Sequence, residues 1–157
     1  MSRKKKRTRK KKKLYSIELT GILLIFLAIL AFGEFGFVGE FLANIIKVFL
    51  GKTYQLFTII LSILGVYYIF KGKSPKVKRS PFLGITLLYL TILLGLHLNM
   101  FKPIMEADIN ILSASWRNLK RLFDSTIPVQ NIGGGMIGAV LYAASYFLFE
   151  NIGSYIL

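Results

Sequence analysis

The sequence predicts an all-α integral membrane protein, and three observations lead to that fold class. Of the 157 residues 54% are hydrophobic, and the mean hydropathy is +0.58. A soluble domain of this size exposes too much of its surface to be so apolar. Long apolar stretches are bounded by charges, and the lysines and arginines gather in two segments instead of being spread along the chain.

A polycationic arm begins the chain. Ten of the 21 lysines and arginines lie in residues 3–13, whereas the rest of the chain carries 11 bases and 7 acids. A dense run of like charges repels itself and forms no packed core. We therefore expect residues 1–13 to be a disordered cytoplasmic arm and residues 14–157 to be a polytopic membrane domain. The run is too long for a secretory signal, and no small-residue cleavage site follows it.

Three stretches are apolar enough to cross a bilayer. A hydrocarbon core of about 30 Å requires about 20 apolar residues in a helix. Residues 19–37, 53–70 and 82–101 approach this length. Their few polar side chains, Glu34, His97 and Asn99, fall near span ends, where they reach the interface. We expect three full transmembrane helices.

Two further stretches, residues 38–50 and 109–123, are amphipathic and are predicted to lie along the membrane surface. The expected apolar faces are formed by Phe41, Leu42, Ile45, Ile46 and Phe49 in the first and by Ile109, Leu112, Trp116, Leu119 and Phe123 in the second. The expected polar faces are formed by Glu40, Asn44 and Lys47 and by Asn110, Arg117, Lys120, Arg121 and Asp124.

A short, glycine-led apolar helix is predicted over residues 133–149. Its gap-free part is only about 21 Å long at 1.5 Å per residue, so we expect it to dip into the membrane instead of crossing it. Small residues at helical spacing let two backbones approach closely, either between subunits or within one subunit. These residues are Gly133, Gly134, Gly135, Gly138, Ala139 and Ala143.

The distribution of bases predicts the orientation. The arm carries ten bases and residues 71–81 carry five, whereas residues 33–52 and 102–132 balance bases with acids. We therefore place the N-terminus and the 71–81 turn in the cytoplasm, and the other two connections outside. The topogenic bases are Arg3, Lys4, Lys5, Lys6, Arg7, Arg9, Lys10, Lys11, Lys12, Lys13, Lys71, Lys73, Lys76, Lys78 and Arg79. We expect them to contact anionic lipid headgroups and, in the arm, to touch DNA phosphates weakly and without sequence preference.

The sequence offers no catalytic, cofactor or metal site. It has no cysteine, one histidine and seven scattered acids. The fragments Gly51-Lys52-Thr53 and Gly72-Lys73-Ser74 resemble the end of a phosphate-binding loop but lack its first glycine, so we interpret them as helix ends. His97 is either a proton carrier at membrane depth or a neutral side chain hydrogen-bonded to a neighbour, and we favour the second.

One family resemblance rests mainly on residues 133–149. The segment Gly-Gly-Gly-Met-Ile-Gly-Ala-Val-Leu-Tyr-Ala-Ala-Ser-Tyr-Phe-Leu-Phe resembles the glycine-led helix before the last membrane span of FtsK/SpoIIIE-type DNA translocases. The basic start, residues 38–44 and residues 96–101 are similar to the same N-terminal membrane region, in a SpoIIIE-like form. The family carries four N-terminal spans, a linker and a cytoplasmic hexameric ATPase that pumps double-stranded DNA. Leu157 falls where the fourth span would begin, so we expect that span to be truncated, and no motor residues have positions here.

The resemblance implies a membrane anchor and assembly module of a DNA translocase, located in the bacterial cell membrane at the division septum. It also implies a homo-oligomer, contacts with division-septum proteins, and DNA handling mainly through the absent motor. A small independent membrane protein, such as a transporter or pore subunit, is the alternative. A third hypothesis makes the arm itself the active part, tethering DNA to the membrane.

Overall fold

The computed structural model is mainly helical and contains no strand in the part of the chain that it describes. It describes the backbone of residues 2–75, 79–101, 110–124 and 131–156, and the side chains of residues 16–75, 79–100, 110–124 and 131–148. The chain forms two compact units, Met1–Leu42 with Gln55–Lys78 and Ala43–Tyr54 with Arg79–Leu157. The all-α class expected from the sequence is confirmed.

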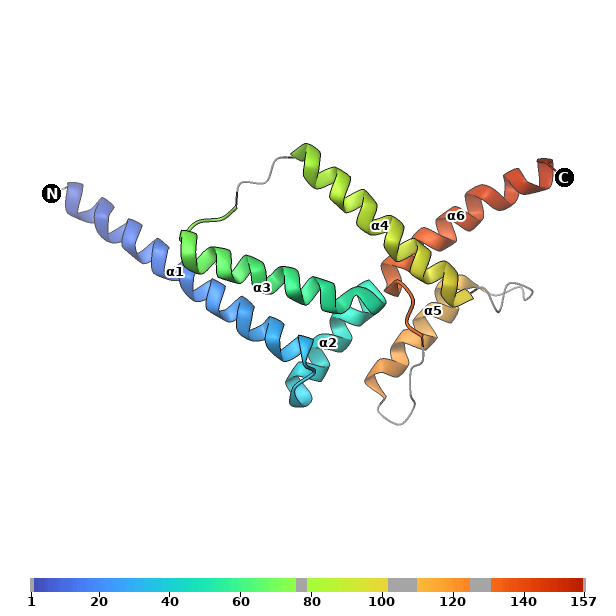
Figure 1. Cartoon of the computed structure of the whole chain (residues 1–157), viewed down its shortest axis with the longest axis horizontal. Helices are drawn as coiled ribbons and strands as arrows, with labels where there is room; N and C mark the ends of the chain where they lie inside the picture. Colours follow the sequence, from blue (N-terminus) through green and yellow to red (C-terminus); the bar gives the residue numbers. More distant parts are fainter. Residues whose placement is uncertain (1, 76–78, 102–109, 125–130, 157) are drawn as a thin grey trace. The chain divides into compact units, whose positions relative to one another are not determined.

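The first unit contains α1 (Ser2–Phe32), the start of α2 (Gly36–Leu50) and most of α3 (Tyr54–Lys71). Helices α1 and α3 run side by side (Figure 1) and approach most closely at two glycines. A Cβ on Gly21 would lie 2.6 Å from the carbonyl oxygen of Gly65, and a Cβ on Gly65 would lie 2.7 Å from that of Gly21. The two backbones are therefore in direct contact.

The first apolar helix ends earlier than the predicted boundary at residue 37. The structure ends α1 at Phe32, where Glu34 adopts a φ of 51° and Gly36 a φ of 61°. The turn lets the amide of Phe35 donate to the carbonyl of Leu30 at 3.1 Å. It also brings Gly39 against α1, where a Cβ would lie 2.4 Å from the Leu30 oxygen. The glycines of this segment thus redirect the chain instead of extending the span.

The structure begins α1 at Ser2, so the backbone of this helix includes the arm. Lysine and arginine are good helix formers, and neither glycine nor proline occurs before Gly21. The side chains of residues 1–15 lie outside the described residues. Disorder of the arm in solution stays a prediction, since like charges one turn apart oppose a helix.

The second unit contains the rest of α2, the short η1 (Gly51–Thr53), α4 (Arg79–Phe101), α5 (Ile111–Lys120), η3 (Arg121–Phe123) and α6 (Gly135–Ile156). Helix α6 is its centre, since it packs against α4, α5 and η1 (Figure 1). Asn110 caps α5 by accepting from the amide of Ser113 at 3.1 Å.

Helix α6 corrects the predicted short helix over residues 133–149. It begins at Gly135, because Gly133 and Gly135 have φ values of 51° and 65° and form the turn before the helix. It then continues to Ile156 and has 22 residues. Glu150 and Asn151 are tolerated in a helix, and Gly153 lowers helix propensity by only about 1 kcal/mol relative to alanine.

The two amphipathic segments are helical, but their buried faces differ from the prediction. In α2 the predicted polar residue Asn44 is buried, while Phe41, Ile45 and Phe49 are exposed. In α5 Leu119 is buried beside Ser115, while Leu112 and Trp116 face outward. Ile109 lies outside the described residues. The packed face of α2 is therefore polar at Asn44 and that of α5 combines Ser115 with Leu119, while Phe41, Ile45, Phe49, Leu112 and Trp116 are exposed.

Among the residues that the structure describes, two helical runs are long and apolar enough, by length and composition, to cross a membrane: Gly36–Lys71 and Arg79–Met100. Shorter apolar helices cover Ser16–Phe32 and Gly135–Leu148. The run Gly36–Lys71 is divided at Gly51, whose φ of 59° separates α2 from α3. The second predicted span, residues 53–70, therefore corresponds to α3, and the third to α4.

The α1–α3 contact predicts that Gly65→Ala destabilises the first unit. The added methyl would meet the Gly21 carbonyl and the Ile25 side chain at 2.7 Å, and overpacking of this kind costs about 1–3 kcal/mol. The matched control is Gly95→Ala in α4, because a Cβ there meets nothing within 4 Å. Thermal unfolding in mild detergent should show a lower midpoint for Gly65→Ala and an unchanged or higher one for Gly95→Ala. Equal midpoints would contradict the contact.

Candidate functional site

The described residues hold no cluster of metal-binding side chains. No group of three or more His, Asp or Glu side chains lies close enough there to hold a metal ion. Gly51 starts η1 and Gly72 ends α3 with a φ of 57°, its amide donating to the carbonyl of Tyr68 at 2.9 Å. The two Gly-Lys fragments are therefore helix ends, as predicted, and the site of interest is a junction between helices.

That junction, which we call the glycine junction, consists of Gly51, Gly133, Gly134, Gly135 and Gly138. All five are buried. A Cβ on Gly51 would lie 2.1 Å from the carbonyl oxygen of Gly133, and a Cβ on Gly135 would lie 2.5 Å from that of Phe49. The amide of Lys52 donates to the Gly133 carbonyl at 2.9 Å. The start of α6 is thus fixed to the α2–α3 connection by backbone alone.

The same glycines also fix α6 to α4. A Cβ on Gly134 would lie 2.1 Å from the carbonyl oxygen of Leu93, and one on Gly138 would lie 2.8 Å from it. Leu93 and Ala139 are both 0% exposed. Without side chains at these positions the two helices come into van der Waals contact along their backbones.

His97 lies at the centre of this contact and is fully buried. Its Nε2 lies 3.0 Å from Oγ of Ser115 on α5, and that hydroxyl donates to the carbonyl of Ile111 at 2.7 Å. Because serine has one hydroxyl proton, Ser115 accepts from His97 and the Nε2 atom carries the proton. The predicted hydrogen-bonded histidine is confirmed. Its ring also stands 6.0 Å from that of Tyr142 on α6, so it links three helices.

Asparagines attach the connections to this junction. Asn118 on α5 donates to the carbonyl of Asn131 at 2.6 Å, and the Asn131 side chain accepts from the amide of Gly133 at 3.1 Å. Asn44 on α2 donates to the carbonyl of Leu122 at 2.8 Å. These bonds satisfy polar groups that are costly to leave unpaired in an apolar interior.

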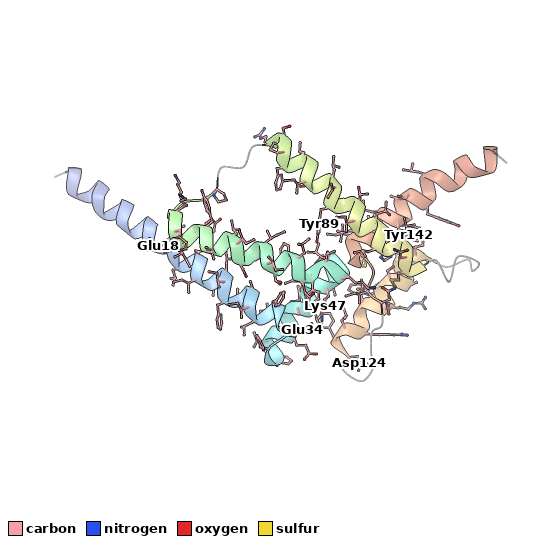
Figure 2. The ribbon with its side chains drawn as sticks, viewed as in Figure 1. Glu18, Glu34, Lys47, Tyr89, Asp124 and Tyr142 are labelled. Atoms are coloured by element: carbon pink, nitrogen blue, oxygen red, sulfur yellow. The ribbon has the colours of Figure 1, made fainter. Side chains whose placement is uncertain are left out.

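One hydroxyl pair joins η1 to α4. Thr53 Oγ1 donates to the carbonyl of Leu50 at 2.9 Å and lies 2.6 Å from the hydroxyl of Tyr89, which therefore donates to it. Figure 2 places Tyr89 on α4 and Tyr142 on α6. The second unit is therefore held by several polar links around a glycine core.

The small residues predicted from the sequence as packing positions meet in this junction. Gly133, Gly134, Gly135, Gly138 and Ala139 are buried against other helices of the same chain, and Ala143 is half-buried. The structure therefore places them in packing within one chain.

Only three of the predicted basic residues have side chains that the structure describes. Lys71, Lys73 and Arg79 are exposed. Lys76 and Lys78, and the side chains of the ten arm bases, lie outside the described residues.

Four residues that contribute to the junction were not predicted as packing residues from the sequence: Gly51, Asn44, Ser115 and Asn118. Gly51 carried a signal, since it follows an amphipathic helix and precedes an apolar one. Asn44 is an ordinary polar-face residue by pattern, and no sequence pattern distinguishes Ser115 or Asn118. Their partners are distant in the sequence, so pattern alone does not find them.

The first unit holds an apolar groove of about 290 Å³ between α1 and α3. It is lined by Ala28, Ile29, Phe32, Phe35, Thr58, Ile59, Ser62 and Ile63. No charged side chain lines it, so it offers no acid, base or phosphate ligand.

The fold and junction define a helical protein with small residues inside, large apolar residues outside and no reactive cluster in its described part. The chain is 36% identical to the DNA translocase SpoIIIE of Bacillus subtilis over 165 aligned residues, which include all of this chain. It is 31% identical to the DNA translocase FtsK of Halalkalibacterium halodurans over 95% of the chain, and 31% identical to that of Listeria monocytogenes over 97%. These relatives confirm the resemblance: the chain is homologous to the N-terminal region of FtsK/SpoIIIE DNA translocases.

The chain spans about a fifth of the length of these relatives, 21% and 20% in the first two. No family model matches it. No solved structure matches it either.

The glycine junction predicts a graded response to alanine. Gly36 and Gly51 both have positive φ, but a Cβ on Gly36 meets nothing within 4 Å. Gly36→Ala therefore measures backbone strain alone, about 1–2 kcal/mol. Gly51→Ala adds the clash with Gly133, and we expect a total loss of about 3 kcal/mol or more in unfolding free energy. Denaturant titration in detergent measures both, and a loss no larger for Gly51→Ala than for Gly36→Ala would contradict the junction.

Proposed function

We propose that this chain is the membrane anchor and assembly module of a septal DNA translocase, and that it performs no chemistry itself. Its relatives are named DNA translocases, and it corresponds to a fifth of their length. In this proposal the motor that moves DNA lies in the remainder of the translocase. The anchor holds that motor at the division septum in the bacterial cell membrane and brings copies together.

The distribution of side chains is the observation that carries the membrane part of the proposal. Apart from Leu93, Leu119 and Tyr142, the buried side chains that the structure describes are small or polar, such as Ala28, Thr58 and Ser115. Large apolar side chains are exposed along every described helix, with Phe37 82% and Phe70 81% exposed. In water this arrangement would forfeit most of the hydrophobic driving force. In lipid it is favourable, because the exterior meets hydrocarbon and the interior packs through small residues.

Three transmembrane helices follow from this proposal, formed by α1, α3 and α4. The bases at residues 3–13 and 71–79 lie in the cytoplasm, where they contact anionic headgroups. Helix α2 and the α4–α6 connection then lie on the outer side, and α6 enters the membrane from there.

The contacts of the second unit support this topology independently of charge. Three chain segments meet there: Gly51–Thr53, the half of α4 around His97, and Gly133–Gly135. All three belong to the outer ends of their helices in the topology set by the bases. If the chain crossed the membrane an odd number of times between any two of these segments, those two segments would lie on opposite sides of the membrane and could not be in contact.

Labelling on dividing cells tests both topology and location. The chain has no cysteine, and Ser74 and Ser113 are both exposed, so each is replaced singly by cysteine. We expect a membrane-impermeant fluorescent maleimide to label Ser113→Cys on intact cells, as a band at the division site. Ser74→Cys, the matched control, reacts only after the membrane is permeabilised. Labelling of Ser74→Cys on intact cells, or uniform labelling of Ser113→Cys around the cell, would contradict the proposal.

A further inference from the structure

We propose that α5 with η3 forms a docking surface for anionic phospholipid headgroups of the outer leaflet. This inference rests on the proposed function, because it requires the second unit to lie in a membrane. The surface consists of Leu112, Trp116, Arg117, Lys120 and Arg121, all of them exposed.

The burial pattern of α5 fixes which way this surface faces. Ser115 and Leu119 are buried, since α5 packs on α6. On the opposite flank Asn118 is held by the carbonyl of Asn131 at 2.6 Å. The arc through Leu112, Trp116, Lys120 and Arg117 is left exposed. The helix is thus fixed to the protein on two sides and presents one defined face outward.

The order of residues around that face matches a membrane surface. At about 100° per residue, the buried pair is followed by Leu112, then Trp116, then Lys120 and Arg117. An apolar strip therefore lies beside the part of the helix that packs on α6, and the cations lie farther out. Tryptophan prefers the headgroup layer, and lysine and arginine stems extend past it to charged headgroups.

Charge identifies the occupant. Helix α5 carries Arg117 and Lys120 in its last turn and no acid in its first turn, and Arg121 follows in η3. The acid Asp124 follows as the C-cap residue of η3. A cationic face next to an exposed indole is complementary to a negatively charged lipid surface.

Position in the chain points the same way. The connection that holds α5 joins the apolar α4, whose candidate span is Arg79–Met100, to the apolar α6. A helix tied to two membrane helices at the same end cannot move far from the bilayer surface. Anionic lipid is therefore the partner within reach.

Trp116 supplies the reporter, since it is the single tryptophan of the chain. The whole chain is reconstituted in phosphatidylcholine vesicles with a minor amount of phosphatidylglycerol, and bromine is placed on the acyl chains of either lipid in matched amounts. We expect brominated phosphatidylglycerol to quench Trp116 fluorescence more strongly than brominated phosphatidylcholine. Arg117→Gln with Lys120→Gln should lower this preference about thirtyfold, the fold-change expected for two charges at about 1 kcal/mol each.

Two control variants make the result specific. Arg117→Lys keeps the charge and should keep the preference. Lys52→Gln removes a charge from another exposed position of the second unit and should leave the preference unchanged.

Equal quenching by the two lipids would overturn the inference and leave the membrane anchor standing. A second result would also overturn it: polyglutamate shifts the Trp116 emission while the two brominated lipids quench equally. The face would then bind acidic polypeptide and not lipid. Failure of the proposed function has a different signature: the chain would not float with the vesicles, and neither lipid would quench Trp116.

Discussion

Direct contact between helix backbones at glycine is the interaction on which the rest of this structure depends. It occurs at Gly21 and Gly65 in the first unit and at Gly51, Gly133 and Gly135 in the second. In hydrocarbon, large apolar side chains gain little by leaving lipid for protein, so association relies on close packing. Glycine provides that packing, and the large side chains remain on the outside. In the proposed membrane setting, the glycine contacts and the apolar exterior are two consequences of one solvent, the hydrocarbon.

Polar groups determine how the connecting segments attach to this frame. His97 and Ser115 join α4 to α5, and Asn44 joins α2 to η3. A buried polar group in apolar surroundings is costly unless it is hydrogen-bonded, which makes each pair specific for its partner. The pairs therefore do what apolar burial cannot do in lipid: they fix the position of short helices against longer ones.

The sequence predicted the elements better than their contacts. Length and hydropathy located α3 and α4, and periodicity located α2 and α5, because these signals are local. The end of α1 was misplaced, since a left-handed Glu34 between Gly33 and Gly36 has no clear sequence signature. The length of α6 was underestimated, because a single glycine inside a helix lowers helix stability too little to end the helix.

Only part of the glycine junction could be predicted from the sequence. The glycines of residues 133–138 were identified as packing residues from their spacing alone. Their partner Gly51 lies 82 residues from Gly133, and no local pattern links the two. Asn44 was assigned to the solvent side, because a polar residue on an amphipathic helix is normally exposed to water. Here the uncharged Asn44 turns inward and is hydrogen-bonded, whereas the charged Glu40 of the same helix stays exposed.

The accessibility of Leu88 tests the central claim, that lipid is the solvent of the exposed apolar surface. Leu88 lies in the middle of α4 and is 64% exposed, whereas Leu93 is 0% exposed. Cysteine and then a nitroxide spin label are introduced at position 88 of the reconstituted chain, and relaxation by oxygen and by a water-soluble nickel chelate is measured. We predict strong relaxation by oxygen, which concentrates in hydrocarbon, and weak relaxation by the chelate. Strong relaxation by the chelate would place this surface in water and contradict the account.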